Sequence, residues 1–300
     1  MTNDFLRAIA HPEATRQGVR LLLWRDDLLS PTLPGNKARK LKYNLQAAHA
    51  AGYKSLLTFG GAYSNHLAAV AAAGRLYGFA TTGLVRGEEQ PPLNPTLAGC
   101  VAAGMRLHYL DRTTYRRRAE PEFLAAMQQQ HGPAYLLPEG GTNALALRGV
   151  AELIGELRQQ TAFDAVAVAA GTGGTLAGLA LGLADAGYAA RAVGIAALKG
   201  GDFLRADINA LTLAATGQVL ANYEVHTGYH FGGYAKLPPD LRAFIRQFEA
   251  DYGVLLDPIY TGKLLYGVLD LIAQGHFAPG STVVAVHTGG LQAWAGFGRH

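Results

Sequence analysis

Cysteine is almost absent from this chain of 300 residues, in which Cys100 stands alone. A single cysteine excludes a disulfide framework and a metal site built from cysteines. This usage is typical of proteins that work in a reducing compartment.

We expect neither an export signal nor an unbroken membrane span in this chain. Its start, MTNDFLRAIAHPEATRQ, has neither the basic flank nor the apolar core of a signal peptide. The uncharged stretch 165–184 reaches the length of a spanning helix, but Gly171, Gly173 and Gly174 interrupt it. A buried strand, a tight turn and a packed helix explain it better. We therefore expect a cytoplasmic protein with no membrane association.

Long basic runs are missing as well, although the formal net charge is +4. The densest run, Arg116 to Arg118, is interpreted as the start of a solvated helix. Without basic residues interleaved with aromatics, we expect no nucleic-acid binding and at most a mild preference for anionic small molecules.

Apolar residues make up 49% of the chain and charged residues 16%, so we expect it to fold throughout. From residue 50 onward, short apolar runs alternate with helical patterns. The predicted strands are 55–59, 81–85, 106–110, 134–138, 165–170, 192–196 and 282–286, and the predicted helices are 37–50, 66–77, 94–103, 120–130, 145–160, 175–186, 238–251 and 263–274. Such alternation predicts an α/β protein with parallel sheets covered on both faces.

No repeat or long linker divides the chain. If there are two lobes, the turn-rich segments around 31–35 and 139–143 are the best places for the chain to cross between them.

Glycine-rich or polar turns follow three predicted strands: GGAYSNH at 60–66, GTGGT at 171–175 and HTGG at 287–290. In the second, backbone N–H groups and a helix N-terminus form a site suited to a phosphate. Leu176 occupies the place of the third glycine of a dinucleotide fingerprint, and Leu264 follows Gly262-Lys263 where a phosphate-binding loop needs Ser or Thr. A Gly-x-Ser-x-Gly nucleophile elbow is also missing.

Lysines are scarce, with seven among 26 basic residues, yet three fall within 37–42. Asn36 is a good N-cap, which places Lys37 in the first turn of a helix that ends near Gly52. The helix dipole and burial there favour a neutral amine, which can form an imine with an aldehyde as arginine cannot. Lys40 lies one turn further on the same face, whereas Lys42 points elsewhere and is expected to be solvated.

Other polar residues have plain structural explanations. Ser64 or Asn65 suits an N-cap, and the tyrosine in LDPIYTGK at 256–263 suits packing. Three carboxylates, Asp26, Asp27 and Glu139, are assigned to turns and the surface. We expect no metal site, because His226 and His230 have Gly228 between them and no evident carboxylate partner.

Taken together, GNKARK, GGAYSN, GTGGT, LDPIYTGK and HTGG, in this order, resemble the 1-aminocyclopropane-1-carboxylate deaminase and D-cysteine desulfhydrase family. This family is a branch of the tryptophan-synthase-β-like, fold-type-II pyridoxal-phosphate enzymes, and the resemblance covers nearly the whole chain. It implies two lobes, each a mostly parallel twisted sheet flanked by helices. We expect a large cofactor-binding domain at 1–39 and 146–300, a smaller domain at 40–145, and a homodimer.

The resemblance also implies roles for single residues. Lys37 is the Schiff-base lysine, Asn65 binds the phenolic oxygen of the cofactor, and Ser64 contacts the substrate carboxylate or assists proton transfer. Tyr260 and, in GGYAK, Tyr234 match active-site tyrosines. The phosphate is held by Lys40 and the backbone of Gly171, Thr172, Gly173, Gly174 and Thr175; Thr288 completes the cofactor site and His66 the substrate site.

Two positions favour the desulfhydrase branch. The deaminase pattern has Glu after the active-site tyrosine and Leu in HxGG, whereas this chain has Thr261 and Thr288. A carboxylate beside the pyridine nitrogen strengthens the electron sink, and a threonine does not, which suits loss of a good leaving group better than opening of a cyclopropane ring.

We therefore expect a lyase that converts a small amino acid, with D-cysteine as the first candidate, to pyruvate and ammonia by α,β-elimination. The alternatives are a 1-aminocyclopropane-1-carboxylate deaminase, a serine or threonine dehydratase, an amino-acid racemase, and a binding protein for pyridoxal phosphate or another phosphorylated metabolite without turnover.

Overall fold

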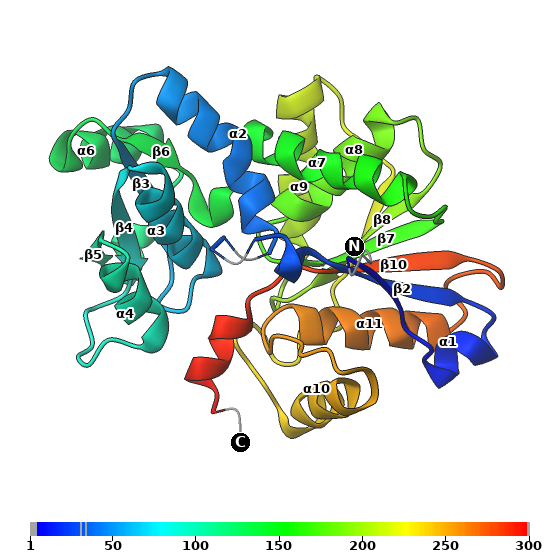
Figure 1. The fold of residues 1–300 in the computed structure, drawn as a ribbon. Helices are drawn as coiled ribbons and strands as arrows, with labels where there is room; N and C mark the ends of the chain where they lie inside the picture. Colours follow the sequence, from blue (N-terminus) through cyan, green and yellow to red (C-terminus); the bar gives the residue numbers. More distant parts are fainter. Residues whose placement is uncertain (1–4, 31, 34, 299–300) are drawn as a thin grey trace.

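The computed structural model describes residues 5–30, 32–33 and 35–298, and contains two sheets flanked by helices (Figure 1). The larger sheet has the strand order β1-β2-β10-β7-β8-β9. Only β1 is antiparallel to its neighbour, and the other pairs are parallel. Its strands are β1 (Leu6–Ala8), β2 (Arg20–Arg25), β7 (Ala165–Ala170), β8 (Arg191–Ala196), β9 (Tyr223–His226) and β10 (Thr282–His287).

The smaller sheet is wholly parallel, with the order β5-β4-β3-β6. Its strands are β3 (Ser55–Gly60), β4 (Ala80–Arg86), β5 (Met105–Leu110) and β6 (Tyr135–Leu137). The helices around it are α3 (Asn65–Tyr77), α4 (Pro95–Ala102), α5 (Arg112–Arg116) and α6 (Pro121–His131). The predicted α/β fold with mostly parallel sheets is confirmed.

Helices cover both faces of the larger sheet, as its composition requires. Every residue of β7, AVAVAA, is buried, which is typical of a central parallel strand. One face is covered by α7 (Ala144–Arg158), α8 (Gly174–Asp185) and α9 (Phe203–Thr216), and the other by α1 (Pro12–Arg16), α10 (Pro239–Tyr252) and α11 (Thr261–Ala273).

The helix α2 (Lys37–Ala50) runs between the two sheets and packs against α7 (Figure 1). The two helices approach closely at Gly149, where an added Cβ would lie 2.0 Å from the carbonyl oxygen of Arg39. Arg39 is buried and donates hydrogen bonds of 2.9–3.0 Å to Asp26, which also accepts one from Trp24. Breaking a buried pair of this kind costs about 3–5 kcal/mol, so the pair fixes the helix that begins with Lys37.

Asp26 and Asp27 were predicted to lie in turns at the surface. The turn is confirmed, but the surface position is wrong, because both side chains are largely buried. Both begin the short 3-10 helix η1 (Asp26–Leu28), but Asp26 is 1% exposed. Asp27 pairs with Arg25 at 2.6 Å, and its side chain is 6% exposed. Neither carboxylate lines the active-site cavity described below.

All seven predicted strands and all eight predicted helices are present, with ends that differ by at most two residues. The strands β1, β2 and β9 and the helices α1, α5 and α9 were not predicted from the sequence. The missed strands lie at or next to an edge of the larger sheet, and β2 pairs in parallel with β10 from the far end of the chain.

After β6, the short 3-10 helix η2 (Glu139–Gly141) leads from the smaller sheet to α7. This is one of the two predicted crossing segments; of the other, Pro31 and Pro34 lie outside the described residues. Domain limits at residues 40 and 145 stay a prediction. In the described ranges, no helix is both long and apolar enough to cross a membrane.

Candidate active site

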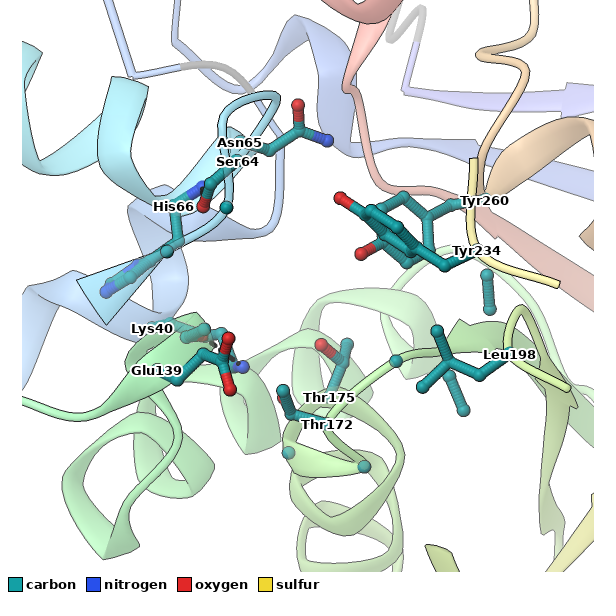
Figure 2. A pocket seen from close by; sticks show the side chains of 18 of the residues that line it. Lys40, Ser64, Asn65, His66, Glu139, Thr172, Thr175, Leu198, Tyr234 and Tyr260 are labelled. Atoms are coloured by element: carbon teal, nitrogen blue, oxygen red, sulfur yellow. Dashed lines mark hydrogen bonds between the residues drawn. The ribbon is translucent and has the colours of Figure 1, made fainter. Parts of the chain in front are cut away.

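A cavity of about 330 Å³ opens where the carboxyl ends of strands from both sheets face each other (Figure 2). Gly60 ends β3, Gly171 follows β7 and Thr288 follows β10, and all three line it. Every residue predicted for the site lies at this cavity: Lys37, Lys40, Ser64, Asn65, His66, Gly171, Thr172, Gly173, Gly174, Thr175, Tyr234, Tyr260 and Thr288. The loops after parallel strands therefore converge as the fold predicts.

Lys37 is the first residue of α2, and its Nζ donates a hydrogen bond of 2.9 Å to Oδ1 of Asn36. Burial lowers the pKa of Lys37 from 10.5 to about 8, and the negative charge of Asp257 partly opposes this shift. The amine is therefore neutral in an appreciable fraction of molecules near neutral pH, as nucleophilic attack on an aldehyde requires.

Asn36 was predicted to be the N-cap. It occupies that position, but its side chain makes no capping hydrogen bond. Its Nδ2 instead donates a hydrogen bond of 2.8 Å to Oγ1 of Thr175. The chain just before it is held by Gly35, which has a φ of +71° and would place a Cβ 1.9 Å from the carbonyl oxygen of Thr288. Only glycine allows this approach, which sets Lys37 beside the loops of two strands.

Lys40 is buried, and its Nζ donates hydrogen bonds of 2.7 Å to the carbonyl of Gly140 and 2.9 Å to Oγ1 of Thr142. Burial and then the charge of Lys37 lower its pKa well below the usual value. A cation in this position is stabilised by a bound anion. Lys42, in contrast, is half-exposed and pairs with Glu152, as expected for a solvated side chain.

The loop 171–175 joins β7 to the N-terminus of α8 and forms the floor of the cavity (Figure 2). Gly173 has a φ of +74°. A Cβ on Gly174 would lie 2.6 Å from Thr142 and 3.0 Å from Nζ of Lys40. The first N–H groups of a helix lack partners within it, so this glycine-lined start, with Lys40 beside it, suits a phosphate.

Ser64 is the N-cap of α3, since its Oγ accepts hydrogen bonds of 3.2 Å from the N–H groups of His66 and Leu67. The structural role considered for Ser64 is thus confirmed, and the residue lines the cavity as well. Asn65 accepts a 2.6 Å hydrogen bond from Gln292, a residue that the sequence analysis did not single out. Gln292 follows HTGG by two residues and orients the Asn65 amide.

His66 is buried and held by a 2.8 Å hydrogen bond between its Nε2 and Thr58. Burial, followed by the charges of Lys37 and Lys40, lowers its pKa well below the usual value. His66 is therefore a neutral side chain at the wall of the cavity.

Tyr234 and Tyr260 face the cavity with their rings edge to face, 6.2 Å between centroids (Figure 2). Burial raises the pKa of both phenols, most strongly that of Tyr260. Both hydroxyl groups stay protonated at neutral pH and are able to donate. Nζ of the buried Lys263 donates to the carbonyl of Gly233 at 2.7 Å and so holds the segment that carries Tyr234.

Of the two threonines that favour the desulfhydrase branch, only Thr288 lines the cavity. Thr261 is fully buried at the start of α11, where its hydroxyl donates a 2.7 Å hydrogen bond to Asp257. Asp257 also accepts hydrogen bonds from the N–H groups of Ile259 and Tyr260. Thr261 thus supports the turn that presents Tyr260, and its hydroxyl does not line the cavity.

Two charged residues that were not predicted for the site line the cavity. Glu139, assigned to a turn or the surface, accepts hydrogen bonds of 2.7 Å from Tyr115 and 2.6 Å from Arg118. Arg118, assigned to a solvated helix start, lies beyond the end of α5 and lines the cavity with Arg86. Their contacts join segments that are far apart in sequence, so no local pattern marks them. The cavity is also lined by Leu198, Phe203 and Asp207, which were not predicted from the sequence.

These residues fit a phosphorylated aldehyde. The cavity presents the Lys37 amine, with a pKa of about 8, and a helix start at which an added Cβ on Gly174 would meet Thr142 and Lys40. Lys40, a second buried lysine with a lowered pKa, lies beside that start. Pyridoxal phosphate has both groups that this arrangement suits, an aldehyde and a phosphate.

Residues 9–289 match the family described as pyridoxal-phosphate dependent enzyme. A Pyrococcus horikoshii protein with the name "Putative 1-aminocyclopropane-1-carboxylate deaminase" is 31% identical, over 96% of this chain and 90% of that protein. A D-cysteine desulfhydrase of Klebsiella pneumoniae is 30% identical, over 94% of this chain and 90% of the relative.

A solved structure described as an ACC deaminase homologue superimposes with a TM-score of 0.86 at 30% identity, over 98% of this chain and 91% of the other. The matched family uses pyridoxal phosphate, and the cavity has the amine and the helix start that this molecule requires. The cofactor is therefore pyridoxal phosphate. The chain belongs to the pyridoxal-phosphate-dependent enzymes, in the family of 1-aminocyclopropane-1-carboxylate deaminases and D-cysteine desulfhydrases.

Proposed function

We propose that this enzyme is a lyase that removes the β-substituent of a small amino acid, with D-cysteine as its substrate. The observation that carries the proposal is the pairing, in one cavity, of the Lys37 amine with the protonated phenols of Tyr234 and Tyr260. An elimination needs a base for the α-proton and an acid for the leaving group, and these side chains differ in pKa in the required sense.

The cofactor, when bound, draws electron density from the α-carbon of the substrate and so acidifies its α-proton. Lys40 and the backbone of Gly171 to Thr175 would hold its phosphate, and Asn65 its phenolic oxygen. Ser64, at the positive end of the α3 dipole, would bind the substrate carboxylate. Thr288 would lie beside the cofactor and His66 would line the substrate side.

In the proposed reaction, neutral Lys37 takes the α-proton while the bond between Cβ and sulfur breaks. Tyr260, assisted by Tyr234, gives a proton to the departing sulfur. The overall reaction consumes one water for each D-cysteine and releases pyruvate, ammonia and hydrogen sulfide. No external oxidant or reductant is needed.

The size of the cavity supports a small substrate. Ligand pockets commonly measure about 300–1,000 Å³. The present one, of about 330 Å³, must hold both the cofactor and the amino acid. Its volume is at the small end of this range, which favours a small amino acid.

The second candidate is 1-aminocyclopropane-1-carboxylate deaminase, named in the Pyrococcus relative and in the solved homologue. The same base and acid suit ring opening, which yields 2-oxobutyrate and ammonia. Thr288 favours the first candidate, because it stands where the deaminase pattern has leucine. Thr288 also lines the cavity, whereas Thr261, the other threonine that differs from the deaminase pattern, does not.

The test is product analysis with the purified holoenzyme. We expect pyruvate and sulfide from D-cysteine, and pyruvate from β-chloro-D-alanine, in excess over 2-oxobutyrate from the cyclopropane amino acid. Thr288→Leu should move this ratio toward the cyclopropane substrate. The reverse preference in the wild type would support the deaminase instead. Chiral analysis of recovered substrate separates a lyase from a racemase, and D-serine tests for a dehydratase.

The resemblance also supports a homodimer in the cytoplasm, with domains at 1–39 plus 146–300 and at 40–145. Residues 1–4, 31, 34 and 299–300 of the larger domain lie outside the described residues. Sedimentation equilibrium should give twice the 31.7 kDa mass of the chain, and a single-chain mass would contradict the homodimer.

A further inference from the structure

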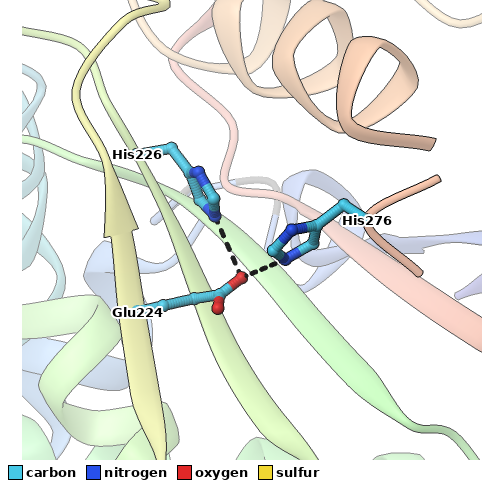
Figure 3. Close-up of side chains that lie close together, drawn as sticks. All are labelled: Glu224, His226 and His276. Carbon is cyan, nitrogen blue, oxygen red and sulfur yellow. Dashed lines mark hydrogen bonds and ion pairs between the residues drawn. The ribbon is translucent and has the colours of Figure 1, made fainter. Parts of the chain in front are cut away.

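Three potential metal ligands converge at the far edge of the larger sheet: Glu224, His226 and His276 (Figure 3). Oε1 of Glu224 lies 2.9 Å from Nε2 of His226 and 2.7 Å from Nε2 of His276. One ligand atom from each residue falls within 4.8 Å of the other two. The two imidazole rings are 5.0 Å apart and almost perpendicular.

The fold explains why these residues meet. Along β9, Tyr223 and Val225 are buried in the core under α8 and α9, so Glu224 and His226 point to the opposite face of the strand. On that face α11 packs against β7, β8 and β10. His276 lies in the turn after α11, three residues beyond Ala273, and reaches across to Glu224.

The sequence analysis paired His226 with His230 at a helical spacing, and no metal site was expected because Gly228 lies between them and no carboxylate partner was evident. In the structure His226 ends a strand, where neighbours on one face are two residues apart, and the partner is Glu224. His230 lies outside the cluster, and its Nδ1 accepts a hydrogen bond from the N–H of Gly232. None of the three converging residues lines the active-site cavity.

We propose that Glu224, His226 and His276 bind one Zn²⁺ ion. Two imidazole nitrogens and a carboxylate oxygen are a ligand set that zinc accepts, with water as the fourth ligand. In a tetrahedral site with ligands about 2.0–2.2 Å from the metal, neighbouring ligand atoms lie about 3.3–3.6 Å apart.

Only small movements convert the present cluster into that geometry. The two contacts to Glu224 must lengthen by about 0.4–0.9 Å. The two imidazole nitrogens, which lie within 4.8 Å of each other, must reach the same spacing. The side chains of Glu224, His226 and His276 are 21%, 23% and 34% exposed, so they have room to adjust and the ion has a path of entry.

The site has a structural consequence. Zinc would join the edge strand β9 to the turn that precedes β10. His226 is also the residue from which the chain continues into the segment 227–236, which carries Tyr234 into the cavity. Binding of the ion to the native state alone would stabilise it by mass action.

The test is equilibrium dialysis of the holoenzyme against Zn²⁺, with the bound metal measured by atomic absorption. We expect one zinc per wild-type chain and at least tenfold weaker binding in Glu224→Gln and in His276→Ala. The matched control is His230→Ala, which removes the histidine at helical spacing and should retain the zinc. Zinc should raise the Tm of the wild type and of the control, and leave that of the other two variants unchanged.

Binding in Glu224→Gln and His276→Ala as tight as in the wild type would overturn the proposal, as would no binding by the wild type. Loss of zinc in His230→Ala alone would assign the ion elsewhere. Glu224→Gln keeps the shape of the side chain, so its far-UV circular dichroism should match the wild type and show that the fold is intact. We expect this variant to form pyruvate from D-cysteine although it no longer binds zinc. Loss of the metal site can therefore be distinguished from failure of the proposed lyase activity.

Discussion

Asn36 and Thr175 are joined by a hydrogen bond of 2.8 Å from Nδ2 to Oγ1, and both residues are buried. Asn36 comes directly before Lys37, and Thr175 ends the loop 171–175, for which we propose phosphate binding and which is called the phosphate loop below. The same Asn36 side chain accepts a hydrogen bond from Nζ of Lys37. The Asn36 amide therefore sets the distance between the Lys37 amine and the loop 171–175. The proposed cofactor must fit between these two groups, with its aldehyde at the amine and its phosphate at the loop.

Replacing this amide should weaken cofactor binding. Asn36→Ala leaves the hydroxyl of Thr175 without its donor in a buried place, which costs about 1–3 kcal/mol. We expect the dissociation constant for pyridoxal phosphate to rise by about tenfold or more. Titration of the apo-protein, followed by absorbance, measures it.

The matched control is Asn94→Ala. Asn94 caps α4 by accepting from the N–H groups of Thr96 and Leu97, away from the cavity. This variant should lose about 1 kcal/mol of stability and no cofactor affinity. Equal affinity losses in the two asparagine variants would show that the Asn36 contact is not specific to the cofactor site.

Gly174→Ala tests the phosphate loop. The new Cβ would lie 2.6 Å from Cγ2 of Thr142 and 3.0 Å from Nζ of Lys40, so both side chains must move. Because they adjoin the start of α8, we expect cofactor affinity to fall at least tenfold, although alanine is the better helix former. Isothermal titration with pyridoxal phosphate measures the change.

Gly155→Ala is the corresponding control within a helix. An added Cβ at Gly155 meets nothing within 4 Å, so the substitution should stabilise α7 by about 0.5–1 kcal/mol and leave affinity unaltered. Unchanged cofactor affinity in Gly174→Ala would mean that phosphate does not bind at this loop.

Tyr260→Phe should separate chemistry from binding. Removal of the hydroxyl takes away the proposed acid but keeps the ring that packs beside Gly171. We expect kcat for pyruvate formation to fall by about 10²–10⁴-fold with an unchanged cofactor spectrum. Tyr229→Phe, which removes a hydroxyl bound to Asp270 away from the cavity, should keep kcat within twofold. A fully active Tyr260→Phe would remove this tyrosine from the mechanism.

The lowered pKa of Lys37 predicts a pH dependence of cofactor uptake. Only the neutral amine attacks an aldehyde, and with a pKa of about 8 its fraction rises about tenfold between pH 7 and pH 9 and then levels off. A lysine with the usual value would give a rise of about 100-fold over the same range, continuing to higher pH. Stopped-flow mixing of apo-protein with pyridoxal phosphate distinguishes the two.

Asp257→Asn supplies an internal check on the cause of this pKa. The charge of Asp257 raises the pKa of Lys37 against the effect of burial, so its removal should move the inflection to lower pH. A shift to higher pH would contradict the electrostatic explanation.

Much of the site could be predicted because its signals are local. The cluster at 37–42 and the glycines of 171–175 stand in short motifs, and the carboxyl ends of parallel strands bring such motifs together. The helix predicted at 37–50 has those limits in the structure. The place of Lys37 in the first turn of this helix therefore follows from the sequence pattern alone.

The rest depends on contacts between distant segments. Glu139 meets Arg118 across a turn and a helix, and β2 pairs with a strand more than 250 residues away. Glu224 and His276 meet only because Glu224 points to the face of the sheet on which α11 packs, and His276 lies just after the end of that helix. No spacing rule along the chain reveals such neighbours, since strand order and helix packing determine them.

The most direct test of the central claim is the visible absorption spectrum of the purified protein with pyridoxal phosphate, beside that of Lys37→Ala, before and after addition of D-cysteine. The wild type should show the absorption of lysine-bound cofactor, a change on addition of substrate, and release of pyruvate. Lys37→Ala should lack the lysine-bound absorption and form no pyruvate. A Lys37→Ala protein with the wild-type spectrum and turnover would contradict the assignment of Lys37.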